Sequence, residues 1–172
     1  MHQPCKMKGF FVFSAVENGV CEDTTPGRYE YFFLDNLCGM DCSQPKGIVF
    51  SAKTKWDVLI ALRDSKTNDQ TIEIVIGGWS NTKSVIRSEA EGPSLVEYHQ
   101  NGLLDENEFR SFWVSWAGGN IKHVKVGTGS TVGQNTFMEQ QIPQEINFIG
   151  YSGWGPYNLE WKFESCGSKY RD

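Results

Sequence analysis

Three shortages narrow the function of this 172-residue chain before any motif is considered. Basic residues are the minority, with 16 Lys and Arg against 21 Asp and Glu, so the positive surplus typical of nucleic-acid-binding proteins is missing. No run of about 18 apolar residues occurs, and the sequence therefore predicts no membrane-spanning helix. The three histidines, His2, His99 and His123, are scattered, which argues against a structural zinc site.

Motifs of the common enzyme classes are also lacking. The chain contains no Gly-x-Ser-x-Gly, His-Glu-x-x-His or Walker pattern. One glycine-rich segment, Gly127 to Gly129, could cradle a cofactor, but no amphipathic helix follows it. We interpret it as a turn between antiparallel strands. We therefore expect no catalytic residue, no cofactor and no metal ion.

The five cysteines lie towards the ends of the chain and in a predicted loop, at Cys5, Cys21, Cys38, Cys42 and Cys166. Such positions are typical of disulfide bonds that hold flexible segments, and these bonds persist in secreted proteins. We expect disulfides among Cys21, Cys38, Cys42 and Cys166, with Cys21–Cys166 as the preferred pair. The sequence then belongs to a mature secreted chain, and a cytoplasmic protein is the alternative. The odd count leaves a thiol for pairing between chains, and we expect a homo-oligomer.

Alternation of apolar and polar residues dominates the chain and predicts an all-β fold. Leu159 to Glu164 shows it clearly, with apolar residues on one face and charged residues on the other. About ten such segments joined by glycine-rich turns favour a single antiparallel β-sandwich or jelly-roll-like domain. We place this domain at residues 29–165, with an N-terminal segment (1–28) packed on or stapled to it and a C-terminal tail (166–172). Four tryptophans are expected in the core: Trp56, Trp113, Trp116 and Trp161.

Four blocks carry a family pattern. They are the strand, Gly-Gly-Trp turn and strand at Ile72–Arg87, the aromatic strand at Glu108–Trp116, the Val126–Gly129 segment after Ile121, and the Gly150–Gly155 ending. In this order they resemble the farnesoic acid O-methyltransferase-type domain of invertebrate proteins, over roughly residues 29 to 165. The family name implies methyl transfer from S-adenosylmethionine to farnesoic acid. Members also occur as modules of secreted and complement-like proteins, which implies binding.

Residues suited to binding a sugar are grouped in two segments. Sugar sites combine a flat aromatic face with planar polar side chains for the hydroxyl groups. Alternation along the second strand of the Gly-Gly-Trp hairpin places Asn81, Lys83 and Arg87 on one outward face, so Lys83→Ala and Arg87→Ala should leave stability nearly unchanged. Burial of Trp79 and Trp154 in the core is the alternative. The expected ligand-binding residues are Trp79, Asn81, Thr82, Lys83, Arg87, Trp154 and Tyr157.

These observations favour a non-enzymatic, secreted recognition module. The preferred ligand is a glycan or glycoprotein, which would make the protein lectin-like. A protein-interaction module and a farnesoic acid methyltransferase are the alternatives.

Overall fold

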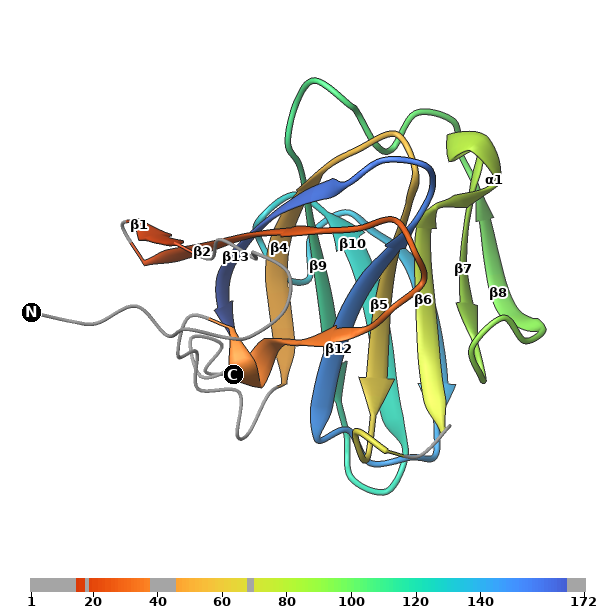
Figure 1. Cartoon of the computed structure of the whole chain (residues 1–172). Helices are drawn as coiled ribbons and strands as arrows, with labels where there is room; N and C mark the ends of the chain where they lie inside the picture. Colours follow the sequence, from red (N-terminus) through yellow and green to blue (C-terminus); the bar gives the residue numbers. More distant parts are fainter. Residues whose placement is uncertain (1–14, 18, 38–45, 68–69, 167–172) are drawn as a thin grey trace, which may run out of the picture.

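The computed structural model describes residues 15–17, 19–37, 46–67 and 70–166. It is a sandwich of two antiparallel sheets, which confirms the predicted fold class (Figure 1). The seven-stranded sheet contains, in spatial order, β1 (Ala15–Glu17), β2 (Val20–Thr25), β13 (Leu159–Cys166), β4 (Gly47–Lys53), β9 (Arg110–Ala117), β10 (Lys122–Thr128) and β11 (Thr136–Ile142). The six-stranded sheet contains β3 (Phe32–Phe33), β12 (Phe148–Trp154), β5 (Asp57–Arg63), β6 (Thr71–Gly77), β7 (Lys83–Arg87) and β8 (Ser94–His99). Two short turns of helix complete the described elements, η1 (Leu34–Asn36) and α1 (Gly78–Asn81).

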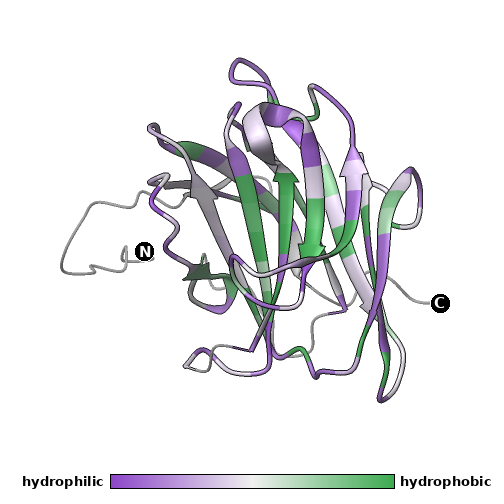
Figure 2. Ribbon diagram, turned by 90° about the vertical axis from the view of Figure 1, so that its right-hand side faces the viewer, coloured by the Kyte–Doolittle hydropathy of each residue, from purple (hydrophilic) through white to green (hydrophobic). Residues whose placement is uncertain are grey.

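The core between the sheets is built from aliphatic side chains and a cluster of aromatic rings. Trp161 and Phe163 alternate inward along β13 and stack with their ring centroids 5.7 Å apart. Tyr151 meets both rings edge-on from β12 of the opposite sheet. Figure 2 shows the hydrophobic residues concentrated along the strands and the hydrophilic residues in the connecting loops. Burial of apolar area on this scale is the main force that holds such a sandwich together.

Three of the four tryptophans assigned to the core from the sequence are buried: Trp113, Trp116 and Trp161. Trp56 is different. Trp56 was expected to lie within a strand, but it precedes β5 by one residue and lines a surface pocket.

Strand β2 was not expected, because its sequence Val-Cys-Glu-Asp-Thr-Thr is polar. The structure shows why polar residues can face the core here. Tyr151 donates a hydrogen bond of 2.5 Å to the buried Asp23, and the indole of Trp161 donates one of 2.7 Å to Thr25. Burial nevertheless raises the pKa of Asp23 above its ordinary value. Residues 20–25 therefore form a strand of the sandwich, beside β13.

The cysteines can be compared with the predicted pairing only in part. Cys21 is buried and disulfide-bonded. It lies opposite Phe163 in the ladder between β2 and β13. The pairing of Cys21 with Cys166 stays a prediction. Cys5, Cys38 and Cys42 lie outside the described residues.

The glycine-rich segment at residues 127–129 joins two antiparallel strands, as the sequence predicted. It ends β10 and leads into the connection to β11, with Gly129 in the left-handed region at φ 87°. Gly127 has a second role in packing. A Cβ at this position would lie 2.3 Å from ring carbons of the buried Trp113, whose indole donates a hydrogen bond of 2.9 Å to the carbonyl oxygen of Gln134.

Among the residues described, none of the helical segments has the length and hydrophobicity that a bilayer-spanning helix requires.

We predict that Gly127→Ala lowers the free energy of unfolding by about 1–3 kcal/mol, because the added methyl group displaces the Trp113 ring. Urea unfolding followed by tryptophan fluorescence measures this loss. Gly119→Ala is the matched control, since a Cβ at Gly119 meets no atom within 4 Å. Equal stability of the two variants would contradict the packing argument.

Candidate functional site

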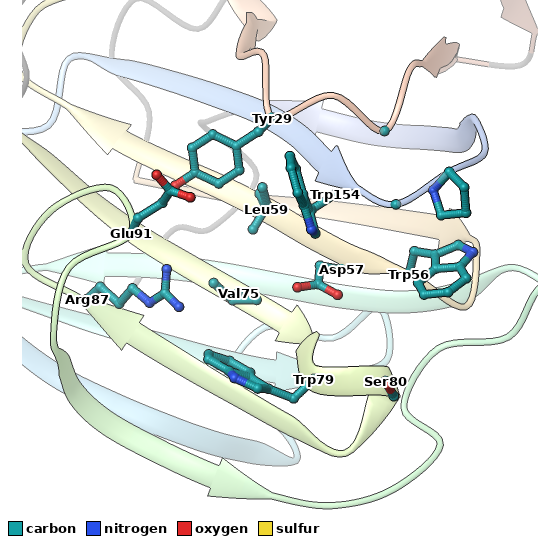
Figure 3. A pocket seen from close by; sticks show the side chains of 13 residues that line it. Tyr29, Trp56, Asp57, Leu59, Val75, Trp79, Ser80, Arg87, Glu91 and Trp154 are labelled. Atoms are coloured by element: carbon teal, nitrogen blue, oxygen red, sulfur yellow. The ribbon is translucent and has the colours of Figure 1, made fainter.

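A pocket of about 610 Å³ opens on the outer face of the six-stranded sheet, the face turned away from the other sheet. It lies beside α1, the strands β5 and β6, and the connection from β12 to β13 (Figure 3). Two tryptophans, Trp79 and Trp154, stand on opposite sides of it, and Asp57 lies between them. The lining residues are Gly27, Tyr29, Trp56, Asp57, Leu59, Val75, Trp79, Ser80, Arg87, Glu91, Trp154, Gly155 and Pro156.

The floor of the pocket is apolar because the central strands are apolar on both faces. Leu59 of β5, Val75 of β6 and Val85 of β7 form a buried cluster separate from the main core. Tyr29 and Tyr31 pack against this cluster from the segment that precedes β3. The tyrosines cover one part of the outer face of the six-stranded sheet, and the pocket lies on the uncovered part beside Tyr29.

Trp79 is presented by an unusual backbone. Trp79, Ser80 and Asn81 have consecutive φ values of 51°, 61° and 61°, so α1 contains a left-handed turn made without glycine. Each such residue costs roughly 1–2 kcal/mol relative to the ordinary conformation. Strain of this kind persists where the surrounding contacts enforce it, and it is concentrated at functional sites.

Asn81 and Thr82 supply the contacts that hold the turn. The Asn81 amide donates a hydrogen bond of 2.8 Å to the carbonyl oxygen of Leu104 and accepts one of 3.1 Å from the Leu104 N–H. The Thr82 hydroxyl donates a bond of 2.7 Å to the carbonyl oxygen of Trp79. Both side chains thus bond to backbone groups of the protein itself. Asn81 is also a residue type that tolerates the left-handed conformation.

Gly78 lets α1 approach the floor closely. A Cβ at Gly78 would lie 2.9 Å from a methyl carbon of Val75 and 3.2 Å from a carboxylate oxygen of Asp57. This is the physical reason for the second glycine of the Gly-Gly-Trp motif, because a larger residue would lift the tryptophan away from the sheet.

The walls of the pocket are large aromatic rings that solvent reaches. Trp79 is 45% exposed and Trp154 is 56% exposed. Trp154 packs edge-on against Tyr29, with ring centroids 6.1 Å apart. Trp79 lies over two cations of β7, with Lys83 Nζ 4.0 Å and the Arg87 guanidinium carbon 5.3 Å from its ring centroid. Cation–π contacts of this kind fix the orientation of the ring.

A buried carboxylate accepts hydrogen bonds from several of the residues around the pocket. Glu73 of β6 is 0% exposed and accepts hydrogen bonds from the hydroxyl groups of Tyr29 and Tyr31. Arg87 donates a bond of 2.8 Å to its other oxygen, and the backbone N–H of Glu91 donates one of 3.2 Å. Burial, followed by the contacts with Glu73, raises the pKa of both tyrosines, so their hydroxyl groups remain protonated donors.

Asp57 is the second carboxylate of the site, at the start of β5. Its surroundings differ from those of Glu73, because no ion pair to Asp57 is found among the described residues. Partial burial raises the pKa of Asp57, and its own backbone N–H and the charge of Arg87 oppose this change. Asp57 is thus a partly desolvated carboxylate that points into the pocket (Figure 3).

The structure brings together only part of the predicted site. Trp79 and Arg87 of the Gly-Gly-Trp hairpin and Trp154 of β12 line one pocket, although Trp154 is distant from the other two in the sequence. Lys83 lies under Trp79 and forms an ion pair of 3.2 Å with Glu97. Tyr157 is exposed and is not among the lining residues.

Sequence reasoning missed several lining residues, above all Asp57, Glu91 and Tyr29. Asp57 could have been recognised as a candidate from the sequence, because it is an acidic residue at the start of a strand that is otherwise apolar on both faces. Tyr29 could not have been recognised in this way, since the position of its ring depends on Glu73, far away in the sequence.

The fold and the pocket define an antiparallel β-sandwich domain with a ligand-sized site on its surface. A family model described as farnesoic acid O-methyltransferase matches residues 25–166, and the chain belongs to this family. "Uncharacterized protein 5" of Haliotis asinina is 32% identical over 85 residues, which are 48% of this chain and 49% of that protein. The chain therefore matches about half the length of this curated relative.

Two solved structures show weaker likenesses. A Crh5 transglycosylase in complex with NAG has a TM-score of 0.48 at 12% identity, covering 94% of this chain and 79% of that one. The tail fiber protein gp63.1 of an E. coli phage has a TM-score of 0.40 at 8% identity, covering 89% and 22%. Likenesses at this level do not bear on the ligand.

We predict that Asn81→Ala lowers the free energy of unfolding by about 2–3 kcal/mol, because two hydrogen bonds to Leu104 are lost and alanine tolerates the left-handed conformation poorly. Chemical denaturation measures the change. Ser80→Ala is the matched control, being an exposed neighbour in the same conformation, and should stay within about 0.5 kcal/mol. An Asn81→Ala protein of unchanged stability would return Asn81 to the set of ligand contacts.

Arg87→Ala should destabilise the protein, in contrast to the expectation from strand alternation. The Arg87 side chain is only 14% exposed, and its removal leaves the buried Glu73 without its cation, a change that costs about 3 kcal/mol or more. Lys83→Ala breaks an ion pair with an exposed partner and should cost less than about 1 kcal/mol. Thermal melting of the two variants side by side tests the difference; equal melting temperatures would show that the Glu73 pair is unimportant.

Proposed function

We propose that the domain is a recognition module whose pocket binds a carbohydrate. The observation that carries this proposal is the pair of tryptophans, Trp79 and Trp154, which face a single cavity while each remains about half exposed. Large aromatic side chains are highly buried on average in folded proteins. Rings held open to solvent on opposite sides of a cavity offer flat apolar surfaces, which match the C–H faces of a sugar ring.

The strained turn supports the same proposal. Folding alone does not require three left-handed residues without glycine in a hairpin, and a glycine or asparagine turn would connect β6 and β7 at lower cost. The turn places Trp79 over the pocket and is stabilised by bonds from Asn81 and Thr82. The conformational strain of this turn is explained if a ligand requires Trp79 in that position.

The polar groups of the pocket suit hydroxyl groups. Asp57 and Glu91 can accept hydrogen bonds, Ser80 can do both, and the Nε of Arg87 is a buried donor without a protein partner in the structure. A cavity of about 610 Å³ lies within the range of small-molecule sites, roughly 300–1,000 Å³. This combination of an apolar floor, aromatic walls and a few polar groups is typical of sites that fix the orientation of a ligand.

Methyl transfer to farnesoic acid, which the family description names, is the second candidate. The apolar floor formed by Leu59 and Val75 could accept an isoprenoid chain. Secretion and homo-oligomer formation, expected from the cysteines, stay predictions.

A glycan array tests the proposal, followed by titration calorimetry with the best ligand. We expect Trp79→Ala and Trp154→Ala each to weaken binding by about tenfold or more, because a ring–sugar contact is lost. Melting temperatures should change little, since both rings are half exposed. Ile121→Ala removes an equally exposed apolar side chain that does not line the pocket and should bind like the wild type.

A parallel titration with S-adenosylmethionine and farnesoic acid separates the two candidates. Binding of these compounds without any glycan signal would favour methyl transfer. Glycan binding that survives both tryptophan substitutions would place the carbohydrate site elsewhere.

A further inference from the structure

The charged groups that line the pocket are mostly acidic. Asp57 and Glu91 are the lining carboxylates, and Arg87 is the one basic residue among the lining residues that the structure describes; it is already bonded to the buried Glu73. The pocket therefore carries an excess of negative charge, which a bound ligand has to tolerate or to neutralise.

The two cations that lie against the ring of Trp79 are already used within the protein. Arg87 is paired with the fully buried Glu73 at 2.8 Å. Lys83 is paired with Glu97 at 3.2 Å and lies against the ring of Trp79. The basic residues that the sequence offered for ligand binding are thus neutralised, and they fix the pocket rather than attract an anion to it.

Asp57 and Glu91 have no such partner within the described part of the chain. Asp57 is partly buried between the two tryptophans, and its nearest positive charge, Arg87, is held by Glu73. Glu91 is exposed at the rim, and its backbone rather than its side chain contacts Glu73. A partly desolvated carboxylate without a partner is costly, and a cation of the ligand would remove this cost.

The aromatic walls favour a cation for an independent reason. The faces of aromatic rings carry partial negative charge and attract ammonium groups, most strongly when the ring is that of tryptophan. Trp79, Trp154 and Tyr29 all line the same cavity as Asp57. The charge and the rings therefore select the same kind of ligand group.

We propose that the pocket recognises a saccharide that carries a free, protonated amino group, with the ammonium group bound by Asp57 and the sugar ring lying between Trp79 and Trp154. This inference rests on the proposed carbohydrate-binding function and narrows it to amino sugars that are not acetylated. Acetylation removes the positive charge and so removes the interaction with Asp57.

Titration calorimetry with matched oligosaccharides tests the inference. The probes are a glucosamine tetramer, an N-acetylglucosamine tetramer and an uncharged glucose tetramer, compared at about pH 6 so that the amino groups carry a proton. We expect the wild type to bind the glucosamine tetramer about tenfold or more tightly than the other two. In Asp57→Asn this preference should fall to within about threefold, since asparagine keeps the shape and loses the charge.

Two controls isolate the charge of Asp57 from the overall acidity of the chain. Asp35→Asn removes an exposed carboxylate on η1 that does not line the pocket, and should keep the full preference. The melting temperature of Asp57→Asn at neutral pH should equal or exceed that of the wild type. Burial raises the pKa of Asp57, so the folded protein without ligand loses stability as the pH rises through that pKa, and asparagine avoids this loss.

The outcomes separate the inference from the proposed function. The amino-sugar inference would be overturned if the three tetramers bound equally, or if the acetylated or the uncharged tetramer bound more tightly. Carbohydrate binding at the pocket would remain supported in that case, provided that the binding is lost in Trp79→Ala. A preference for glucosamine that persists in Asp57→Asn would overturn the assignment to Asp57. Absence of binding to any tetramer would overturn the inference, and the glycan array then decides whether carbohydrate binding fails with it.

Discussion

The carboxylate of Glu73 is the contact on which the whole outer face of the six-stranded sheet depends. A charge buried completely in a protein is tolerated only when cations and hydrogen-bond donors surround it. Here the donors come from three separate parts of the chain: the tyrosines before β3, Arg87 at the end of β7, and the backbone of Glu91 in the loop that follows. Satisfying this one carboxylate therefore positions the tyrosines, the arginine and the loop around the pocket.

The fold was largely predictable from the sequence because each half-buried strand carries its own alternation. Leu159 to Glu164 needs no partner to show which side faces inward. The exceptions were strands whose facing residues are satisfied by distant groups. Residues 20–25 resemble a polar turn until Tyr151 and Trp161 are placed beside Asp23 and Thr25.

The site was less predictable, for a reason that Trp79 illustrates. Composition identified the Gly-Gly-Trp turn as chemically unusual, and the tryptophan does line the pocket. The function of its neighbours depended on geometry that no local pattern encodes. Asn81 has its amide directed to Leu104, and Arg87 is turned to Glu73. Residue types thus located the site, and only the three-dimensional contacts separated the groups that build it from those left free to bind.

The two walls of the pocket belong to parts of the chain that meet only in the finished sheet. Trp79 follows β6 and Trp154 ends β12, and β5 lies between these strands. An unfolded chain therefore has no such pocket, and a ligand of this pocket would bind the native state alone. Mass action then makes occupancy a source of stability, worth about 2.7 kcal/mol when the free ligand is at a hundred times its dissociation constant. Under the proposed function, such occupancy would offset the strain in the left-handed turn and the desolvation of the Asp57 carboxylate.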